Sequence, residues 1–397
     1  MSSQYLHPES PWLLVLLAGL VALGPLSIDM YLPAMPAMQA ALHTDISSMH
    51  FTVSAYLIGF SLFHLLCGPL ADRYGRKPIL LGGTLLFMAA CLGCSLSETV
   101  EELWLWRFAQ GIGACVGPTL ARTIARDIFG PTRAARALSI IAMLMALAPA
   151  IAPTLGGLML LVLPWPGIFV FLACYGALMI VLTRRYVPES LPAPQSLHPA
   201  AILRNYKELL ADPQYLTVTL AGGLTYATML TYLASSSFVY IDMLGVPVQY
   251  YGPIFLTTVL GYMAGSAISA KLSSSRGSES LVLIGSAVSF GAILSMWAAS
   301  ELFPASVLAL VLPMTVFTAA MGLILPHAMA VALQPFTHIA ATASSLLGFI
   351  QMSLSAVASA LIGLFLTTTP RPMIIAMVLI SFLSLLLARR VYRTACR

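Results

Sequence analysis

Two ionisable side chains stand inside long apolar runs of the sequence and are the first candidates for chemistry. Asp29 lies in the run 12–41, and Arg107 lies in the run 103–126. A charged group in a bilayer core costs about 3 kcal/mol on insertion scales, so such residues face a partner or a water-filled cavity. Desolvation raises the pKa of a carboxyl group, whereas a nearby cation lowers it. A carboxylate held in this way can take a proton from one side of a membrane and release it on the other.

The composition shows which kind of protein must hold these two residues. Of 397 residues, 59% are hydrophobic and 8% are charged, and the mean hydropathy is +0.92. Soluble domains contain about 45–50% apolar and about 25% charged residues. The composition therefore excludes a soluble enzyme, a nucleic-acid-binding domain and a disordered chain, and it predicts an all-α integral membrane protein.

Apolar runs long enough to cross a bilayer recur along the chain, at about 20 residues for each helix. The twelve predicted spans are 12–41, 49–71, 78–97, 103–126, 135–161, 167–186, 215–241, 250–272, 280–299, 305–331, 339–367 and 372–390. A β-barrel is excluded, because its strands alternate apolar and polar residues over about ten positions.

The basic residues predict the orientation of these spans. With the N-terminus in the cytoplasm, every Lys and Arg except Arg107 and Arg371 falls at an inner loop, an inner helix end or the C-terminal tail. The acids of the outer loops are Asp45, Glu98, Glu101, Glu102, Asp242 and Glu301. Because Lys and Arg concentrate on the cytoplasmic side, we expect both chain ends in the cytoplasm.

The spans divide into two groups of six that resemble a faded repeat. We expect an N-terminal bundle at 1–186, a cytoplasmic linker with a short amphipathic helix at 187–214, and a C-terminal bundle at 215–397. The glycines aligned by a shift of 202 residues are Gly59 with Gly261, Gly75 with Gly277, and Gly83 with Gly285. Two pseudo-symmetric six-helix halves are a transporter architecture, with the substrate site near the midplane between them.

The loop after the second span reads GPLADRYGRKP over 68–78. It resembles the G-x-L-a-D-r-x-G-r-k motif of the major facilitator superfamily (MFS), although a basic loop can also simply anchor topology. The resemblance implies a conformational latch, in which an acid and an Arg bind neighbouring helices. Its residues are Gly68, Asp72, Arg73, Gly75, Arg76 and Lys77, with Asp127 as the acidic partner at the inner end of the fourth span.

Two further segments resemble motifs of the same superfamily. Arg107 begins RFAQGIG, which is similar to the R-x-x-Q-G-x-G motif, although an Arg there can also snorkel to the outer surface. The run APAIAPTLGG at 148–157 resembles the motif that marks proton antiporters. Its expected kink residues are Pro149 and Pro153, its close-packing residues are Gly156 and Gly157, and Ala148 and Ala152 replace two expected glycines.

Together with SIDMYLPA at 27–34, these motifs resemble the Bcr/CflA (bicyclomycin and chloramphenicol resistance) branch of the drug:proton antiporters. The resemblance implies a proton-coupled exporter of small, relatively apolar compounds that works by alternating access. Asp29 would bind the proton and Arg107 would tune it. A purely structural role for Asp29 at a Pro-broken helix is the alternative. Relatives often carry a second acid two turns earlier, where this chain has Val21, so a one-acid proton site is expected.

Other polar residues inside the apolar runs are weaker candidates. Those that could line a substrate cavity are Tyr31, Tyr56, Gln110, Tyr226, Tyr232, Tyr262, His327 and Gln351. His64 and His327 could titrate near neutral pH, although a histidine in a span is more often a satisfied packing residue. Six cysteines form neither a disulfide framework nor a metal-ligand pattern.

A transporter of one natural metabolite, such as a nucleoside, sugar, amino-acid derivative or siderophore, is the alternative within the same fold. An intramembrane enzyme is disfavoured, because the sequence has no H-E-x-x-H, no G-x-S-x-G and no P-loop. We therefore expect no enzymatic activity, and no cofactor or metal beyond the proton gradient. The expected partners are a small-molecule substrate, protons and lipid, without nucleic acid, for a monomer in the bacterial inner membrane.

Overall fold

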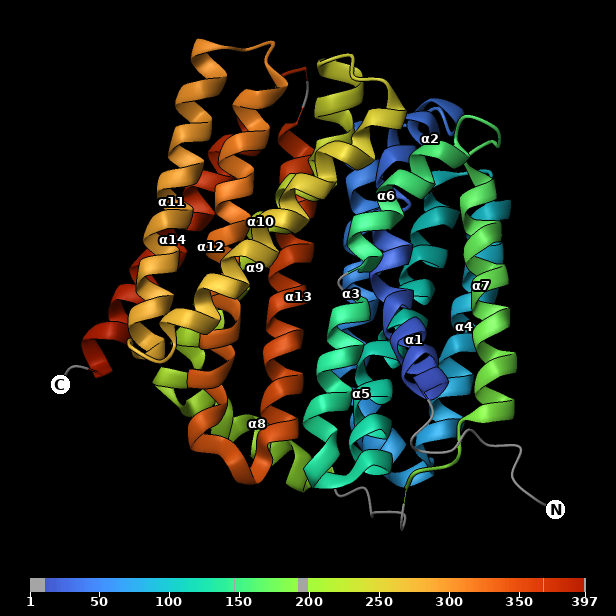
Figure 1. Ribbon diagram of the computed structural model, residues 1–397. Helices are drawn as coiled ribbons and strands as arrows, with labels where there is room; N and C mark the ends of the chain where they lie inside the picture. The colour runs from blue at the N-terminus through green and yellow to red at the C-terminus, as the bar shows by residue number, and fades with distance from the viewer. Residues whose placement is uncertain (1–10, 146, 192–198, 367, 396–397) are drawn as a thin grey trace. The chain divides into compact units, whose positions relative to one another are not determined.

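The computed structural model describes residues 11–145, 147–191, 199–366 and 368–395, and within these ranges it contains helices and turns but no β-strand (Figure 1). The chain forms two compact units. Unit 1 comprises residues 1–42 and 55–198, and unit 2 comprises residues 43–54 and 199–397.

Unit 1 is built around the helix that carries Arg107. Its elements are α1 (Pro11–Asp29), the 3-10 turn η1 (Leu32–Ala34), α2 (Met35–Ala41), most of α3 (Ile46–Tyr74), α4 (Arg76–Leu96), α5 (Val100–Met145), α6 (Leu147–Met159) and α7 (Pro166–Tyr186). Helix α5 packs against α1 and α4, α7 covers α4, and α6 packs against α1 and η1 (Figure 1).

Helix α1 ends at Asp29 because of the proline that follows. Pro25 lies inside α1 without ending it. Pro33 has no backbone N–H, so the carbonyl of Asp29, four residues earlier, loses its helical partner. The chain continues as the 3-10 turn η1 and then α2. The first predicted span is therefore a helix broken directly after Asp29, rather than at Pro25.

The turn between α3 and α4 depends on one glycine. The helix is longer at its end than the predicted second span, 49–71, because α3 continues through Pro69 to Tyr74. Gly75 then takes a φ of 103°, a left-handed conformation that other residues rarely adopt, and α4 begins at the next residue. A tight turn at Gly75 therefore joins α3 to α4.

The fourth and fifth predicted spans correspond to α5 and α6. Helix α5 is 46 residues long and includes the segment 127–134, which was predicted as a loop. Helix α6 carries the proline-rich run, with Pro153 inside the helix.

Unit 2 has a similar set of helices. Its elements are α8 (Pro199–Ala211), α9 (Pro213–Ser237), the π-helical turn η2 (Phe238–Met243), the 3-10 turn η3 (Val248–Tyr250), α10 (Tyr251–Leu272), α11 (Ser278–Leu302), α12 (Val307–Leu333), the 3-10 turn η4 (Gln334–Ile339), α13 (Ala340–Phe365) and α14 (Arg371–Ala395). Helix α12 packs against α9, α10 and α11, and α9 also contacts α13 and α14.

The linker contains the short helix that the sequence predicts. Helix α8 covers 199–211, and α9 starts two residues later. The Asp212 carboxylate accepts a hydrogen bond of 2.6 Å from the backbone N–H of Tyr215 and so caps α9, with Pro213 at its first turn.

Ten helical segments in the described ranges are long and apolar enough to cross a membrane, and a shorter apolar helix covers Ala148–Met159. The ten correspond to all predicted spans except 103–126 and 135–161, which fall in α5 and α6. The all-helical membrane fold predicted from composition is confirmed.

Equivalent glycines of the two units make equivalent contacts. A Cβ on Gly59 of α3 would lie 2.1 Å from the Phe108 carbonyl oxygen of α5, and one on Gly261 of α10 would lie 2.4 Å from the Thr315 carbonyl oxygen of α12. Gly83 and Gly285 likewise face α5 and α12, respectively. The repeat therefore pairs α3, α4 and α5 with α10, α11 and α12.

One aligned glycine does not keep its role. Gly277, which aligns with Gly75, has a φ of −63°, an ordinary value for any residue. The glycine is thus present in both halves, but only Gly75 has the left-handed conformation.

The start of α3 is grouped with unit 2. Residues 43–54, predicted within the N-terminal bundle, pack with unit 2. There the Ser54 hydroxyl donates to the carbonyl of Ala356 at 3.0 Å, and His50 stacks on Phe238 with 5.9 Å between ring centroids.

Candidate functional site

Arg107 lies fully buried in unit 1, on the face of α5 that contacts α1. Its Nη1 donates to the backbone carbonyl of Ser27 at 3.0 Å and to Oε1 of Gln110 at 2.6 Å. Its Nε and Nη2 have no hydrogen-bond partner among the described residues. The guanidinium is therefore only partly satisfied, and an unpaired buried cation is costly. Snorkelling to the surface, the alternative from the sequence, does not occur in this conformation.

Aromatic rings enclose the rest of the guanidinium. The Arg107 Cζ lies 4.3 Å from the ring centroid of Tyr31 and 4.6 Å from that of Tyr56. Such contacts contribute about 2 kcal/mol or more when desolvated. The Tyr56 hydroxyl lies 2.7 Å from that of Ser27, so α1, α3 and α5 meet at this cluster. We call Ser27, Tyr31, Tyr56, Arg107 and Gln110 the Arg107 cluster.

Asp29 lies beside this cluster without an ion pair to it. It is 5% exposed and ends α1, two residues after the carbonyl that accepts from Arg107. Although both side chains are described, no Asp29–Arg107 contact within 4.0 Å is present, contrary to the expected partnership. The structure thus places Asp29 two residues from the carbonyl that binds Arg107, without an ion pair between the two side chains.

The proline-rich motif of α6 packs at the same break. A Cβ on Gly156 would lie 2.3 Å from the carbonyl oxygen of Met30, the residue after Asp29. Only a glycine allows this approach of the two backbones. Gly157 and Pro153 are also buried, and Pro149 is half-buried. The predicted close packing around Gly156 therefore occurs where α1 ends.

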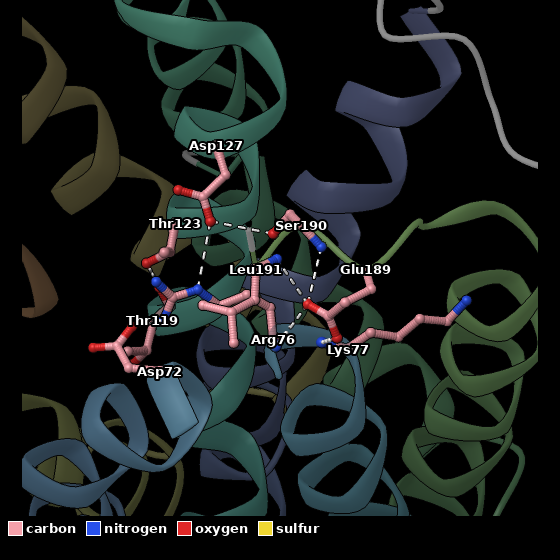
Figure 2. Close-up of polar contacts among 9 residues, drawn as sticks. All are labelled: Asp72, Arg76, Lys77, Thr119, Thr123, Asp127, Glu189, Ser190 and Leu191. Atoms are coloured by element: carbon pink, nitrogen blue, oxygen red, sulfur yellow. Dashed lines mark hydrogen bonds and ion pairs between the residues drawn. The ribbon is translucent and has the colours of Figure 1, made fainter. Parts of the chain in front are cut away.

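A second polar cluster lies twenty residues further along α5, at Asp127, where α3 and α4 meet this helix (Figure 2). The Arg76 guanidinium contacts the Asp72 carboxylate, and its Nε lies 3.4 Å from Oδ2 of Asp127. Arg76 is only 9% exposed, so both carboxylates compensate a largely buried cation. We call Asp72, Arg76 and Asp127 the Arg76 cluster. It joins three helices, as the latch motif implies.

Sequence reasoning missed Glu189, which completes this cluster from the segment after α7. The two Glu189 oxygens accept from the backbone N–H groups of Arg76 at 2.9 Å and Lys77 at 3.1 Å, at the start of α4 (Figure 2). Glu189 therefore caps α4, while Asp72 pairs with the Arg76 guanidinium. The adjacent Ser190 hydroxyl donates to Asp127 at 3.2 Å. An acid 113 residues from its partner gives no local signal.

The remaining motif residues lie near this turn. The Lys77 Nζ donates to the carbonyl of Arg184 at 2.9 Å, at the end of α7. The guanidinium of Arg73, exposed, lies over the ring of Tyr74 at 5.5 Å. A Cβ on Gly68 would meet nothing within 4 Å, so this glycine is not required for packing here.

The predicted cavity residues divide between the units. Tyr31, Tyr56 and Gln110 gather around Arg107. Those of unit 2 are spread over its helices: Tyr226 and Tyr232 on α9, Tyr262 on α10, His327 on α12 and Gln351 on α13.

Two of the polar residues in the spans, Tyr232 and His64, contact other polar side chains of the same unit. The hydroxyl of Tyr232 pairs with that of Tyr240 at 2.8 Å. His64 Nδ1 lies 3.4 Å from the Thr119 hydroxyl and 3.5 Å from the Cys115 sulfur. These contacts are those of packed polar residues.

These features match a known family. Residues 17–360 match the Major Facilitator Superfamily, and the chain belongs to it. The protein is therefore a multi-pass membrane transporter of that fold.

Curated relatives extend over most of the chain. It is 31% identical to the uncharacterized MFS-type transporter YdgK of Bacillus subtilis (strain 168), covering 89% of both proteins. It is 31% identical to the multidrug resistance protein MdtL of Vibrio parahaemolyticus, covering 85% of both. It is 26% identical to a bicyclomycin resistance protein homolog of Haemophilus influenzae, covering 93% of both.

Solved structures show the same fold at low identity. The nucleoside transporter NupG has a TM-score of 0.76 and 15% identity, covering 96% of this chain and 99% of NupG. The xylose transporter XylE from E. coli has a TM-score of 0.73 and 12% identity, covering 96% of both chains.

Proposed function

We propose that this chain is a proton-coupled antiporter that exports small, relatively apolar compounds, antibiotics among them. The observation that carries the proposal is the convergence in unit 1 of Asp29, Arg107 and Gly156 at the break after α1. A buried acid and an incompletely paired cation at one level provide a site whose charge can change. The glycine of the antiporter-like motif packs directly against it.

The names of the relatives support the choice of substrate. MdtL of Vibrio parahaemolyticus is named for multidrug resistance, and the Haemophilus influenzae protein for bicyclomycin resistance. Both align over most of this chain. They favour drug efflux over transport of a single metabolite.

In the proposed cycle, Asp29 binds the proton and Arg107 responds to it. With Asp29 ionised, the guanidinium gains a counter-ion that its Nε and Nη2 lack in the present conformation. With Asp29 protonated, that attraction is absent. The proton thereby changes how α1 and α5 interact, and the membrane potential contributes about 2.3 kcal/mol per charge per 100 mV. The Arg76 cluster holds α3, α4 and α5 together in one state of the alternating-access cycle.

The setting follows from the same proposal. The chain works as a monomer in the bacterial inner membrane with both ends in the cytoplasm. It uses the proton gradient as its energy source, without a bound cofactor or metal. Its partners are the substrate, protons and lipid, without nucleic acid.

The first test is Asp29→Asn in proteoliposomes with an acidic lumen, assayed with antibiotics that include bicyclomycin and chloramphenicol. We expect the wild type to accumulate at least one compound as protons leave, and the variant to lose gradient-driven accumulation while keeping downhill exchange. Asp242→Asn, an acid at the end of η2 in unit 2, is the matched control and keeps wild-type activity. Full gradient-driven transport by Asp29→Asn contradicts the proton role.

A further inference from the structure

The start of α11 in unit 2 occupies the place that α4 has in unit 1. The shift of 202 residues that aligns the glycines places Ser278 on Arg76. The helices that meet there, α10, α11 and α12, correspond to α3, α4 and α5 through the contacts of Gly261 and Gly285. If the second half has a counterpart of the Arg76 cluster, it lies at this position.

Three side chains meet at that position, one from each helix. His327 of α12 lies with Nδ1 3.0 Å from the hydroxyl of Ser278 on α11, and with Nε2 2.9 Å from the hydroxyl of Ser269 on α10. His327 is 8% exposed and Ser269 is 4% exposed. His327 lies two residues before Met329, which aligns with Asp127. We call Ser269, Ser278 and His327 the His327 cluster.

The side chains of this cluster can join three helices through neutral hydrogen bonds alone. A neutral imidazole has one donor and one acceptor nitrogen, and each serine hydroxyl can donate or accept. Both ring nitrogens therefore have partners whichever tautomer is present. Each neutral hydrogen bond contributes about 1 kcal/mol, and no charge has to be desolvated.

We propose that His327 is a positioning residue of the transport cycle, which holds the start of α11 on α10 and α12 as the Arg76 cluster holds the start of α4 in unit 1. The cycle in which it acts rests on the proposed function, whereas the hold itself does not. His327 is thereby removed from the residues expected to line a substrate cavity.

The hold is tested by hydrogen–deuterium exchange of the purified full-length protein in nanodiscs, without substrate or gradient. We expect His327→Leu to speed exchange about tenfold over residues 278–285 and to leave residues 76–83 unchanged. His327→Gln, which can still donate and accept, should stay within about twofold of wild type. The control is His338→Leu, which removes an exposed histidine 3.6 Å from Glu208. Unchanged exchange in His327→Leu overturns the proposal.

A double-mutant cycle separates this role from loss of packing. Ser278→Ala alone should speed the same exchange about threefold, and adding it to His327→Leu should change little, because the contact is already lost. Additive effects overturn the proposal. If His327→Leu does not fold, Ser278→Ala and His327→Gln decide by the same exchange measurement.

The transport role has its own readout in proteoliposomes. We expect His327→Leu to lower kcat about tenfold with KM within about twofold, because the cluster does not touch substrate. A change in KM alone contradicts a positioning role. A wild type without proton-driven transport contradicts the proposed function, and the exchange result stands independently of that outcome.

Discussion

The starts of α4 and α11 occupy corresponding places in two similar sets of helices, yet different chemistry holds them. In unit 1, Arg76 lies between the carboxylates of Asp72 and Asp127. In unit 2, His327 lies between two serine hydroxyls. The comparison shows that the repeat retains the junction of three helices, while the side chains that form it differ.

The difference has an energetic meaning. Removing one partner from a charged cluster leaves an uncompensated charge, whereas removing one hydroxyl from a neutral cluster leaves only an unmet hydrogen bond. The charged junction should therefore be the more sensitive to substitution.

The largest effect is expected from Arg76→Ala. It leaves Asp72 and Asp127 without their common cation, and transport should fall at least about tenfold, with a loss of about 2 kcal/mol in stability. Ser278→Ala, at the aligned position, should lower transport only about threefold. Both are measured by initial rates in proteoliposomes and by thermal unfolding in detergent. Equal losses in the two variants would refute the contrast.

An intermediate effect is expected from the aligned glycines. In Gly75→Ala, the φ of 103° is strained, and the new Cβ would lie 2.6 Å from the Glu189 Oε2. We expect a loss of about 2 kcal/mol. In Gly277→Ala the φ of −63° is allowed and the nearest atom lies at 3.4 Å, so the change should stay within about 0.5 kcal/mol. The melting temperatures of the two variants, compared with that of the wild type, test this difference. Similar shifts in both variants would contradict it.

The smallest effect concerns the caps of the same two helices. Glu189→Ala removes the acceptor for the N–H groups of Arg76 and Lys77 and should cost about 1 kcal/mol, with faster deuterium exchange at the start of α4. Glu279→Ala removes an acid from the first turn of α11 itself, for which a few tenths of a kcal/mol are expected. A larger effect at Glu279 would mean that the local acid is the main stabiliser.

The sequence predicts those features that depend on local chemistry. Apolar length places most spans, and the motif at 68–78 locates the Arg76 cluster and the turn at Gly75. Long-range features have no such signal. Glu189 is 113 residues from Arg76 in the sequence, so no local pattern links the two. Ser269 and Ser278, which contact His327, belong to no motif that would single them out. The rule that proline ends a helix fails at Pro69, which lies inside α3. One missing backbone hydrogen bond is tolerated there because neighbouring helices pack against the helix.

Gly156 is one of several glycines in unit 1 at which two backbones approach closely, and together they limit how the packed segments can move. A Cβ on Gly59, Gly111, Gly117 or Gly156 would lie 2.0–2.3 Å from a backbone oxygen of a neighbouring segment, which is a helix for the first three and the turn after α1 for Gly156. Segments whose backbones are in direct contact cannot slide past one another without losing that packing. This part of unit 1 therefore resists internal shear. Arg107 and Asp127 are twenty residues apart on α5, about 30 Å along its axis if the helix is straight. Under the proposed function, a charge change at Arg107 would reach the Arg76 cluster by displacement of this block as a whole.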